Sequence, residues 1–195
     1  MVKVEINTLQ RAKDGNSING DAYSITETSQ GLLITVADGL GSGPQASAAS
    51  QKALRLIEEN KSLTLKDMII LLHDGLKTTR GAALAIFKIN FMNTWADYVS
   101  VGNVQGIAIC DKVRIFVSTP GILGYNLPEP VFLNTFNLNE LDFLILFTDG
   151  LHITDTSTLK FDANLSSEQV ISILLSTYKV MLDDLTILVV KFVRE

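Results

Sequence analysis

Four places in this chain put aspartate where an apolar segment begins or ends, and carboxylates in such places can bind metal ions. Asp21 begins one segment, Asp38 and Asp149 each end one and precede Gly, and Asp183 and Asp184 lead into another. Carboxylates gathered at strand ends repel one another unless a cation neutralises them. Hard divalent ions such as Mg²⁺ and Mn²⁺ prefer oxygen ligands of this kind and keep water in their remaining positions. The pattern therefore predicts a divalent metal site.

Each Asp-Gly pair also has a purely structural interpretation. Asp-Gly is a common turn pair, and Asp caps helices well. For one pair alone, the turn is the commoner explanation. The four places together favour metal binding, because few other acids fall within apolar segments. The Gly after each Asp lets the backbone come close, so a carbonyl can also act as a ligand.

Other kinds of chemistry find less support. The loop 38–44 (DGLGSGP) follows a strand and opens a helix, but Pro44 stands where a dinucleotide motif needs its third Gly, and the loop has no P-loop lysine. The helix that follows could still attract an anion to its N-terminus. One cysteine, Cys110, and two histidines cannot build a zinc set or an internal disulfide. His152 follows Asp149 closely enough to assist proton transfer.

Composition indicates a globular protein. The chain has 195 residues, of which 47% are hydrophobic and 19% are charged, and this length predicts one domain, 1–195. The net charge of −5 makes nucleic acid an improbable main partner, because an acidic surface repels phosphate backbones. The apolar runs are shorter than the roughly 20 residues that span a bilayer, and the N-terminal segment lacks a signal-peptide pattern. We expect a cytoplasmic protein that does not enter membranes.

Strands and helices are predicted from hydrophobic periodicity and turn signals. The predicted strands are 2–9, 21–28, 31–37, 82–90, 95–101, 106–110, 113–118, 130–136, 142–147 and 185–193. The predicted helices are 45–59, 64–77 and 167–182. Because the strands cluster and two of the helices are adjacent, the order indicates an α+β fold rather than repeated βαβ units. Two packed antiparallel sheets with helices on their outer faces would fit this order of strands and helices.

At these positions the chain resembles the metal-dependent protein phosphatases of type 2C (PPM), and most closely their SpoIIE-like bacterial branch. The motifs occur in family order: Gly20-Asp21, Ala37-Asp38-Gly39, Arg80-Gly81-Ala82-Ala83, Ser100-Val101-Gly102-Asn103, Thr148-Asp149-Gly150 and Asp183-Asp184-Leu185-Thr186. Each motif is weak alone, whereas the ordered set is specific and covers nearly the whole chain. The resemblance implies a four-layer α-β-β-α sandwich with two Mn²⁺ or Mg²⁺ ions in a cleft at one end.

The resemblance also implies roles for particular residues. Asp38 corresponds to the carboxylate that bridges the ions, and Gly39 to the carbonyl ligand. Asp149 and Asp183 correspond to further ligands, and Asp21 to the acid that touches the metals, often through water. Asp38, Asp149 and Asp183 would thus be catalytic through a metal-bound water. Asp184 takes the position usually filled by Asn, so we expect it to accept hydrogen bonds that shape the loop.

The chain also departs from the family pattern. The eukaryotic branch has an arginine shortly before the first acid, whereas this chain has Asn16-Ser17-Ile18-Asn19 there. Lys13 is the nearest upstream base and a possible substrate-binding residue. The run Arg80-Gly81-Ala82-Ala83 lacks the hydroxyl residue that the family has at this motif.

The resemblance favours a monomeric phosphatase that removes phosphate from serine or threonine of bacterial stress-signalling proteins, the scaffold and antagonist proteins of the stressosome. A binding module is the alternative: a catalytically weak phosphatase fold that docks a signalling partner. An unrelated metal hydrolase acting on small substrates is a third hypothesis. Turnover of a phosphate ester with and without Mn²⁺ separates the first two, and competition between phosphoprotein and small esters tests the third.

Overall fold

The computed structural model describes residues 2–127 and 130–194, and its main feature is a pair of antiparallel five-stranded sheets. The first sheet has the order β2 (Asp21–Thr28), β3 (Gly31–Gly39), β4 (Ala82–Asn90), β5 (Trp95–Val101) and β8 (Leu133–Asn137). The second has the order β1 (Val2–Arg11), β12 (Leu185–Arg194), β9 (Phe143–Phe147), β6 (Gln105–Ile109) and β7 (Val113–Ile115). The two antiparallel sheets predicted from the sequence are therefore confirmed.

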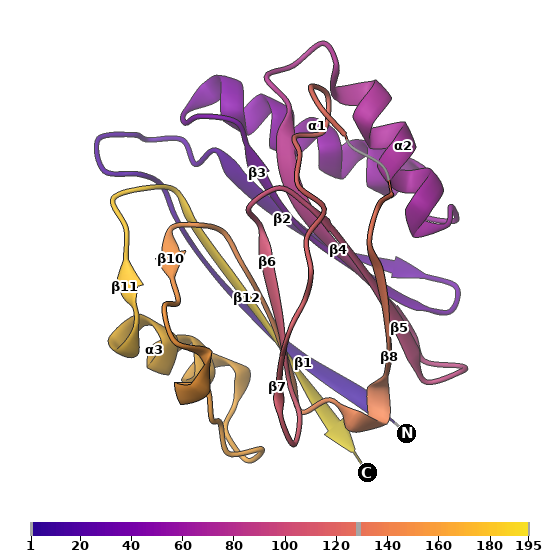
Figure 1. The fold of residues 1–195 in the computed structure, drawn as a ribbon, viewed down its shortest axis with the longest axis vertical. Coiled ribbons are helices and arrows are strands. Elements are labelled where there is room, and N and C mark those ends of the chain that lie inside the picture. Colours follow the sequence, from indigo (N-terminus) through magenta and orange to yellow (C-terminus); the bar gives the residue numbers. More distant parts are fainter. Residues whose placement is uncertain (1, 128–129, 195) are drawn as a thin grey trace.

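Helices cover the outer face of each sheet, giving four layers (Figure 1). The first sheet is covered by α1 (Pro44–Glu59) and α2 (Leu65–Leu76), and the second by α3 (Ser167–Thr177). Shorter elements are the 3₁₀ turns η1 (Leu138–Glu140) and η2 (Thr156–Thr158), and the pair β10 (Leu151–His152) and β11 (Lys179–Val180). The α+β sandwich predicted from the sequence is the observed fold.

Alternation along the central strands builds three apolar layers. In β9, Leu144 and Leu146 pack between the two sheets, whereas Phe143, Ile145 and Phe147 pack beneath α3. Successive side chains of a strand point to opposite faces, so a strand buried on both faces must be apolar throughout. This explains the continuous run FLILF in β9, and β3, β4 and β12 follow the same rule.

The helix starts follow the sequence signals. Pro44 stands in the first turn of α1, which has no side-chain cap. The side chain of Thr64 caps α2 by accepting from the amide of Asp67, and Ser166 and Gln169 form a capping box on α3. None of the helices in the described part of the chain is long and apolar enough to cross a membrane.

The third helix is shorter than predicted. The sequence favours a helix over 167–182, but α3 ends at Thr177 and the chain turns into β11. Lys179 and Val180 pair with His152 and Leu151 of β10, a strand that the periodicity did not indicate. Two-residue strands are too short to show an alternating pattern, so long-range pairing decides this boundary.

Between β7 and β8, the described residues 116–127 and 130–132 form turns and isolated bridges instead of long strands. The predicted strand 113–118 ends at Ile115, and the predicted strand 130–136 is observed as Leu133–Asn137. Within the segment, Thr119 exchanges backbone hydrogen bonds with Ser100 and Gly102 at the end of β5. The segment therefore folds back across the end of the first sheet instead of extending the second.

We predict that Leu146→Ala lowers the free energy of unfolding by about 3 kcal/mol, because the substitution leaves a cavity between the sheets. Leu146 is fully buried, whereas Leu133 in β8 is 54% exposed. The matched control Leu133→Ala should cost less than about 1 kcal/mol. Urea denaturation of both variants checks this, and equal losses would contradict the assignment of Leu146 to the core.

Candidate functional site

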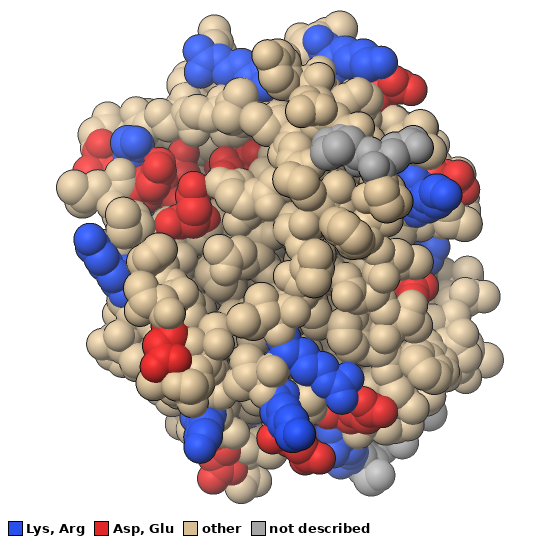
Figure 2. Space-filling model, viewed as in Figure 1, with Lys and Arg blue, Asp and Glu red and all other residues tan. Residues whose placement is uncertain are grey.

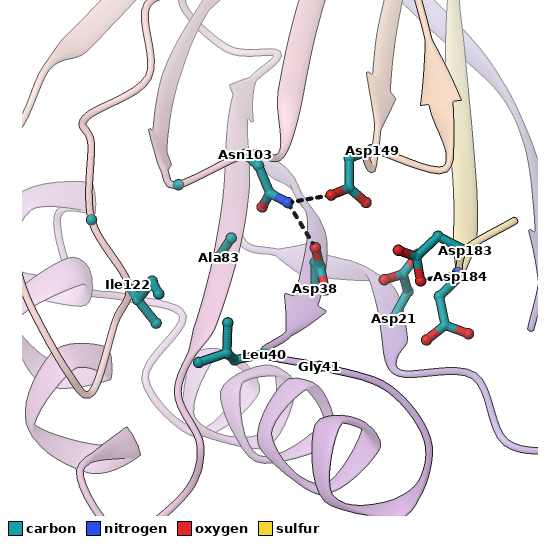
Figure 3. Close-up of a pocket in the computed structure, with 12 residues that line it drawn as sticks. Asp21, Asp38, Leu40, Gly41, Ala83, Asn103, Ile122, Asp149, Asp183 and Asp184 are labelled. Atoms are coloured by element: carbon teal, nitrogen blue, oxygen red, sulfur yellow. Dashed lines mark hydrogen bonds between the residues drawn. The ribbon is translucent and has the colours of Figure 1, made fainter. Parts of the chain in front are cut away.

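The predicted aspartates meet in one cavity of about 360 Å³ at one end of the sandwich. They come from both sheets: Asp21 begins β2, Asp38 is in β3, Asp149 follows β9, and Asp183 and Asp184 precede β12. Figure 2 shows acidic side chains gathered around a hollow on this face. The rest of the lining is formed by Leu40, Gly41, Ala83, Gly102, Asn103, Gly121 and Ile122. Figure 3 shows the five aspartates beside Asn103, Ala83 and Leu40 of this lining.

Asp21 is deeply buried, with a residue exposure of 4%. Its Oδ2 accepts hydrogen bonds from the hydroxyls of Thr148 (2.8 Å) and Thr186 (3.0 Å). The amide of Thr186 donates to the Thr148 hydroxyl at 2.9 Å, and Gln10 Nε2 donates to the Thr186 hydroxyl at 3.0 Å. These bonds join the start of β2 to the second sheet. The other oxygen, Oδ1, is buried and has no hydrogen-bond partner in the structure.

An asparagine links Asp38 to Asp149. Asn103 Nδ2 donates to Asp38 Oδ2 at 3.1 Å and to Asp149 Oδ2 at 2.8 Å (Figure 3). Asn103 follows Gly102, whose φ of 88° lies in the left-handed region, and this turn after β5 directs the amide into the cavity. One amide group thus lies between two carboxylates and offers each of them partial positive charge.

The two adjacent aspartates before β12 have different surroundings. Asp184 is 4% exposed, and it accepts from the backbone amides of Lys13 (2.8 Å) and Gly20 (3.0 Å). This is the loop-shaping role that the sequence predicts for Asp184. Asp183 is about two-fifths exposed and forms an ion pair with Lys13 Nζ at 3.4 Å. Lys13 thus lies beside Asp183, and it is not among the residues that line the cavity.

The site holds carboxylates that resist ionisation. Burial raises the pKa of Asp21 to about 7, and hydrogen bonds from Thr148 and Thr186 only partly offset it. Burial and the charges of Asp21 and Asp149 raise the pKa of Asp38 to about 8. Full ionisation at neutral pH therefore carries a free-energy cost that a bound cation would relieve.

The glycines beside the acids are required by packing. A Cβ on Gly39 would lie 1.9 Å from the carbonyl oxygen of Ala46 in α1, and one on Gly20 would lie 2.7 Å from Asp184 Oδ2. Gly39 is absent from the residues that line the cavity. The absence of a side chain at Gly39 therefore allows α1 to pack closely against the end of β3.

The donor set suits a divalent cation. Five carboxylates face one cavity, one buried oxygen of Asp21 is unpartnered, and the pKa values of two acids are raised. In residues 2–127 and 130–194, however, no three acidic, histidine or cysteine side chains are already grouped around one ion position. Asp38 and Asp149, which now accept from Asn103, are among the carboxylates that could hold such an ion. The residues therefore fit a divalent ion by the chemistry of their oxygen donors.

Three polar residues of the site were missed as site residues. Asn103, Thr148 and Thr186 all lie within motifs quoted above, each at a strand end next to a residue of interest. Their location in these motifs was the one sign that they belong to the site. Polar residues at strand ends are also common turn formers, so their residue types alone did not indicate this role. His152, the proposed proton-transfer aid, is exposed in β10 and does not line the cavity.

We predict that the metal-free protein loses stability as pH rises from about 4 to about 8. Across this range the folded state keeps protons on Asp21 and Asp38, whereas the unfolded chain has released them near its ordinary value of 3.8. Raising the pH therefore favours the unfolded state, by up to about 1.4 kcal/mol per pH unit for each carboxyl.

Urea denaturation in the presence of a chelator at several pH values measures this slope. Asp38→Asn removes one titrating group, so it should flatten the profile and raise stability at pH 8. The exposed Asp111→Asn, in the turn before β7, is the matched control and should leave the slope unchanged. A wild-type stability that stays constant or increases with pH would contradict the prediction.

A family model and a curated relative both match most of this chain. The family model "Stage II sporulation protein E (SpoIIE)" matches residues 28–193. The phosphoserine phosphatase RsbX of Bacillus subtilis (strain 168) is 35% identical in an alignment of 163 residues that covers 80% of this chain and 81% of RsbX. The family model spans Asp38, Asn103 and the acids Asp149, Asp183 and Asp184, whereas Asp21 lies before its first matched residue.

Solved structures share the whole architecture. A crystal structure of RsbX in complex with magnesium superposes with a TM-score of 0.83 at 31% identity, covering 99% of this chain and 100% of that one. A solved structure described as "The bacterial stressosome: a modular system that has been adapted to control secondary messenger signaling" gives a TM-score of 0.85 at 25% identity, covering 97% of this chain and 100% of that one. The chain therefore belongs to the SpoIIE family and has the fold of the PP2C-type phosphatases.

Proposed function

We propose that this protein is a divalent-metal-dependent phosphatase that hydrolyses phosphoserine or phosphothreonine on bacterial stress-signalling proteins, with residues 1–195 forming one phosphatase domain. The observation that carries the proposal is the gathering of five aspartates in one cavity of a chain that belongs to the SpoIIE family. The relative RsbX is a phosphoserine phosphatase, and its crystal structure contains magnesium. These findings support the class of reaction and the class of cofactor.

Asp38, Asp149 and Asp183 are the proposed metal ligands, with Asp21 beside them and the Gly39 carbonyl as a further ligand. We propose two Mn²⁺ or Mg²⁺ ions, with Asp38 between them. Bound divalent ions would acidify a water molecule and offset charge on the phosphoryl oxygens during in-line attack. The buried, unpartnered oxygen of Asp21 and the raised pKa of Asp38 support this assignment, because both features are relieved by nearby positive charge.

The chain's own residues would orient these ligands. Thr148 and Thr186 hold one oxygen of Asp21 and leave the other directed elsewhere. Asn103 controls the separation of Asp38 from Asp149. Asp184 fixes the loop that carries Lys13 and Gly20. A phosphatase of this kind needs no nucleophilic side chain, and the activated water takes that place.

Proteins of the stressosome are the proposed partners, since the description of one similar structure names the bacterial stressosome. Phosphorylated scaffold and antagonist proteins would be the substrates of a monomeric enzyme. The alternative, a catalytically weak docking module, shares the fold but predicts binding without turnover. The retention of all five aspartates favours catalysis, because a docking module has no need for carboxylates that destabilise one another.

We predict that Asp38→Asn abolishes Mn²⁺-dependent hydrolysis of p-nitrophenyl phosphate and of a phosphoserine protein, while the variant remains folded. The amide lacks the charge that a residue between two cations must supply. Steady-state kinetics at saturating Mn²⁺ measures the loss, and circular dichroism confirms the fold. Asp111→Asn removes a distant exposed acid and should keep full activity. Near wild-type turnover by Asp38→Asn would disprove the bridging role.

We predict that Asp183→Asn and Asp184→Asn fail in different ways. Asp183→Asn should weaken Mn²⁺ affinity at least tenfold. Removing a residue that only orients a metal ligand already costs about tenfold, and a direct ligand should cost no less. Asp184→Asn should leave Mn²⁺ affinity nearly unchanged but lower the free energy of unfolding by about 1–3 kcal/mol. The asparagine side chain has only one acceptor oxygen, so it cannot accept from both the Lys13 and the Gly20 backbone amides.

Calorimetric Mn²⁺ titration and urea denaturation of the two variants separate these effects. A larger affinity loss in Asp184→Asn would move the metal ligand one residue along the chain.

A further inference from the structure

A second hollow of about 330 Å³ lies near the aspartate cavity, and its lining includes one basic side chain and no acidic one. Its lining residues are Gln45, Ala48, Thr78, Thr79 and Arg80. Arg80 connects the two hollows: a Cβ on Gly41, which lines the aspartate cavity, would lie 3.0 Å from Arg80 Nη1. Gly41 has φ of 95°, so glycine both permits this turn and lets the guanidinium approach the backbone.

The cations at this hollow lack acidic partners. Among the ion pairs of the described residues, none includes Arg80 or Lys52. Lys52 Nζ reaches the hollow by donating to the neutral hydroxyl of Thr78 at 3.0 Å. No carboxylate is among the lining residues. In a chain with a net charge of −5, two uncompensated cations at one place indicate a site for an anionic group.

The start of α1 adds positive potential on the same side. Gln45 lies in the first turn of α1, which contains no acidic residue and has no side-chain cap. The partial positive charge of a helix N-terminus is therefore not neutralised there by a side chain. Figure 3 shows that the loop carrying Leu40 and Gly41 leads from β3 toward this helix. Gly41 in this loop both lines the aspartate cavity and lies next to Arg80.

We propose that Arg80, assisted by Lys52, binds an acidic side chain of the protein substrate close to its phosphorylated residue. This inference rests on the phosphatase function proposed above and makes Arg80 a specificity-determining residue. Arg80 does not line the aspartate cavity, so a flanking carboxylate fits it better than the phosphate itself. An extended peptide advances roughly 3.3 Å per residue, so a side chain two or three positions away reaches the neighbouring hollow. The planar guanidinium suits bidentate binding of a carboxylate.

The test compares two phosphoserine peptides that differ only in having Glu or Gln two and three positions to each side. Wild-type protein with Mn²⁺ should prefer the Glu peptide about fivefold in kcat/KM, which is the range for a partly exposed ion pair. Arg80→Met should remove this preference through KM, and Arg80→Lys should keep part of it. Hydrolysis of p-nitrophenyl phosphate should stay within about twofold of wild type in both variants, since the small ester has no flanking acid.

Arg114→Met is the matched control, because it removes the same charge from β7, where Arg114 pairs with Glu140. It should keep the Glu preference. Three results would overturn the proposal: a wild-type protein without preference, an equal loss in Arg114→Met, or a KM for the small ester that rises in Arg80→Met as much as for the peptide. The last would assign Arg80 to the phosphate.

A binding measurement separates this inference from the proposed function. Fluorescence anisotropy with Glu and Gln peptides that carry a non-hydrolysable phosphonate reports affinity without turnover. If wild-type protein fails to hydrolyse the small ester, the phosphatase function fails, yet tighter binding of the Glu peptide that is lost in Arg80→Met still supports the anion site. Equal affinities for the two peptides would overturn it.

Discussion

Mutual repulsion among carboxylates at one end of the sandwich is the constraint on which the rest of the site depends. Asp21 and Asp38 carry raised pKa values because they are buried and face other acids. Such an arrangement persists only if the surrounding fold holds it. The three apolar layers of the sandwich supply that stability, because they bury both faces of the central strands. The acids then occupy strand ends, where the layers stop and solvent can enter.

The hydrogen bonds around the acids belong to the fold as much as to the site. Asp21 at the start of the first sheet is held by threonines from the second sheet. Asp184 fastens the N-terminal loop to the start of β12 through two backbone amides. Chemistry at this end of the molecule is therefore coupled to the packing of the two sheets, because the same side chains serve both.

The positive charge of Arg80 lies next to the acidic cavity, and no acidic side chain pairs with it among the described ion pairs. An acidic cleft attracts cations and repels a phosphoprotein, so binding of an anionic substrate needs positive charge from ions or from neighbouring side chains. The glycine-rich loop between β3 and α1 is narrow enough for a guanidinium to lie against it. Acidic and basic regions can thus lie side by side without forming ion pairs that would neutralise both.

The sequence alone determined most of the fold and the membership of the acid cluster. Continuous apolar runs such as FLILF specify strands buried on both faces, and ordered Asp motifs at their ends indicated which carboxylates would meet. The end of α3, the pair β10 and β11, and the course of the chain between β7 and β8 were decided only by the tertiary structure, because pairing between distant segments outweighs local preference there. The same holds for Asn103, Thr148 and Thr186. Their residue types are ordinary at strand ends, and only the meeting of two sheets gives each of them a carboxylate to hold.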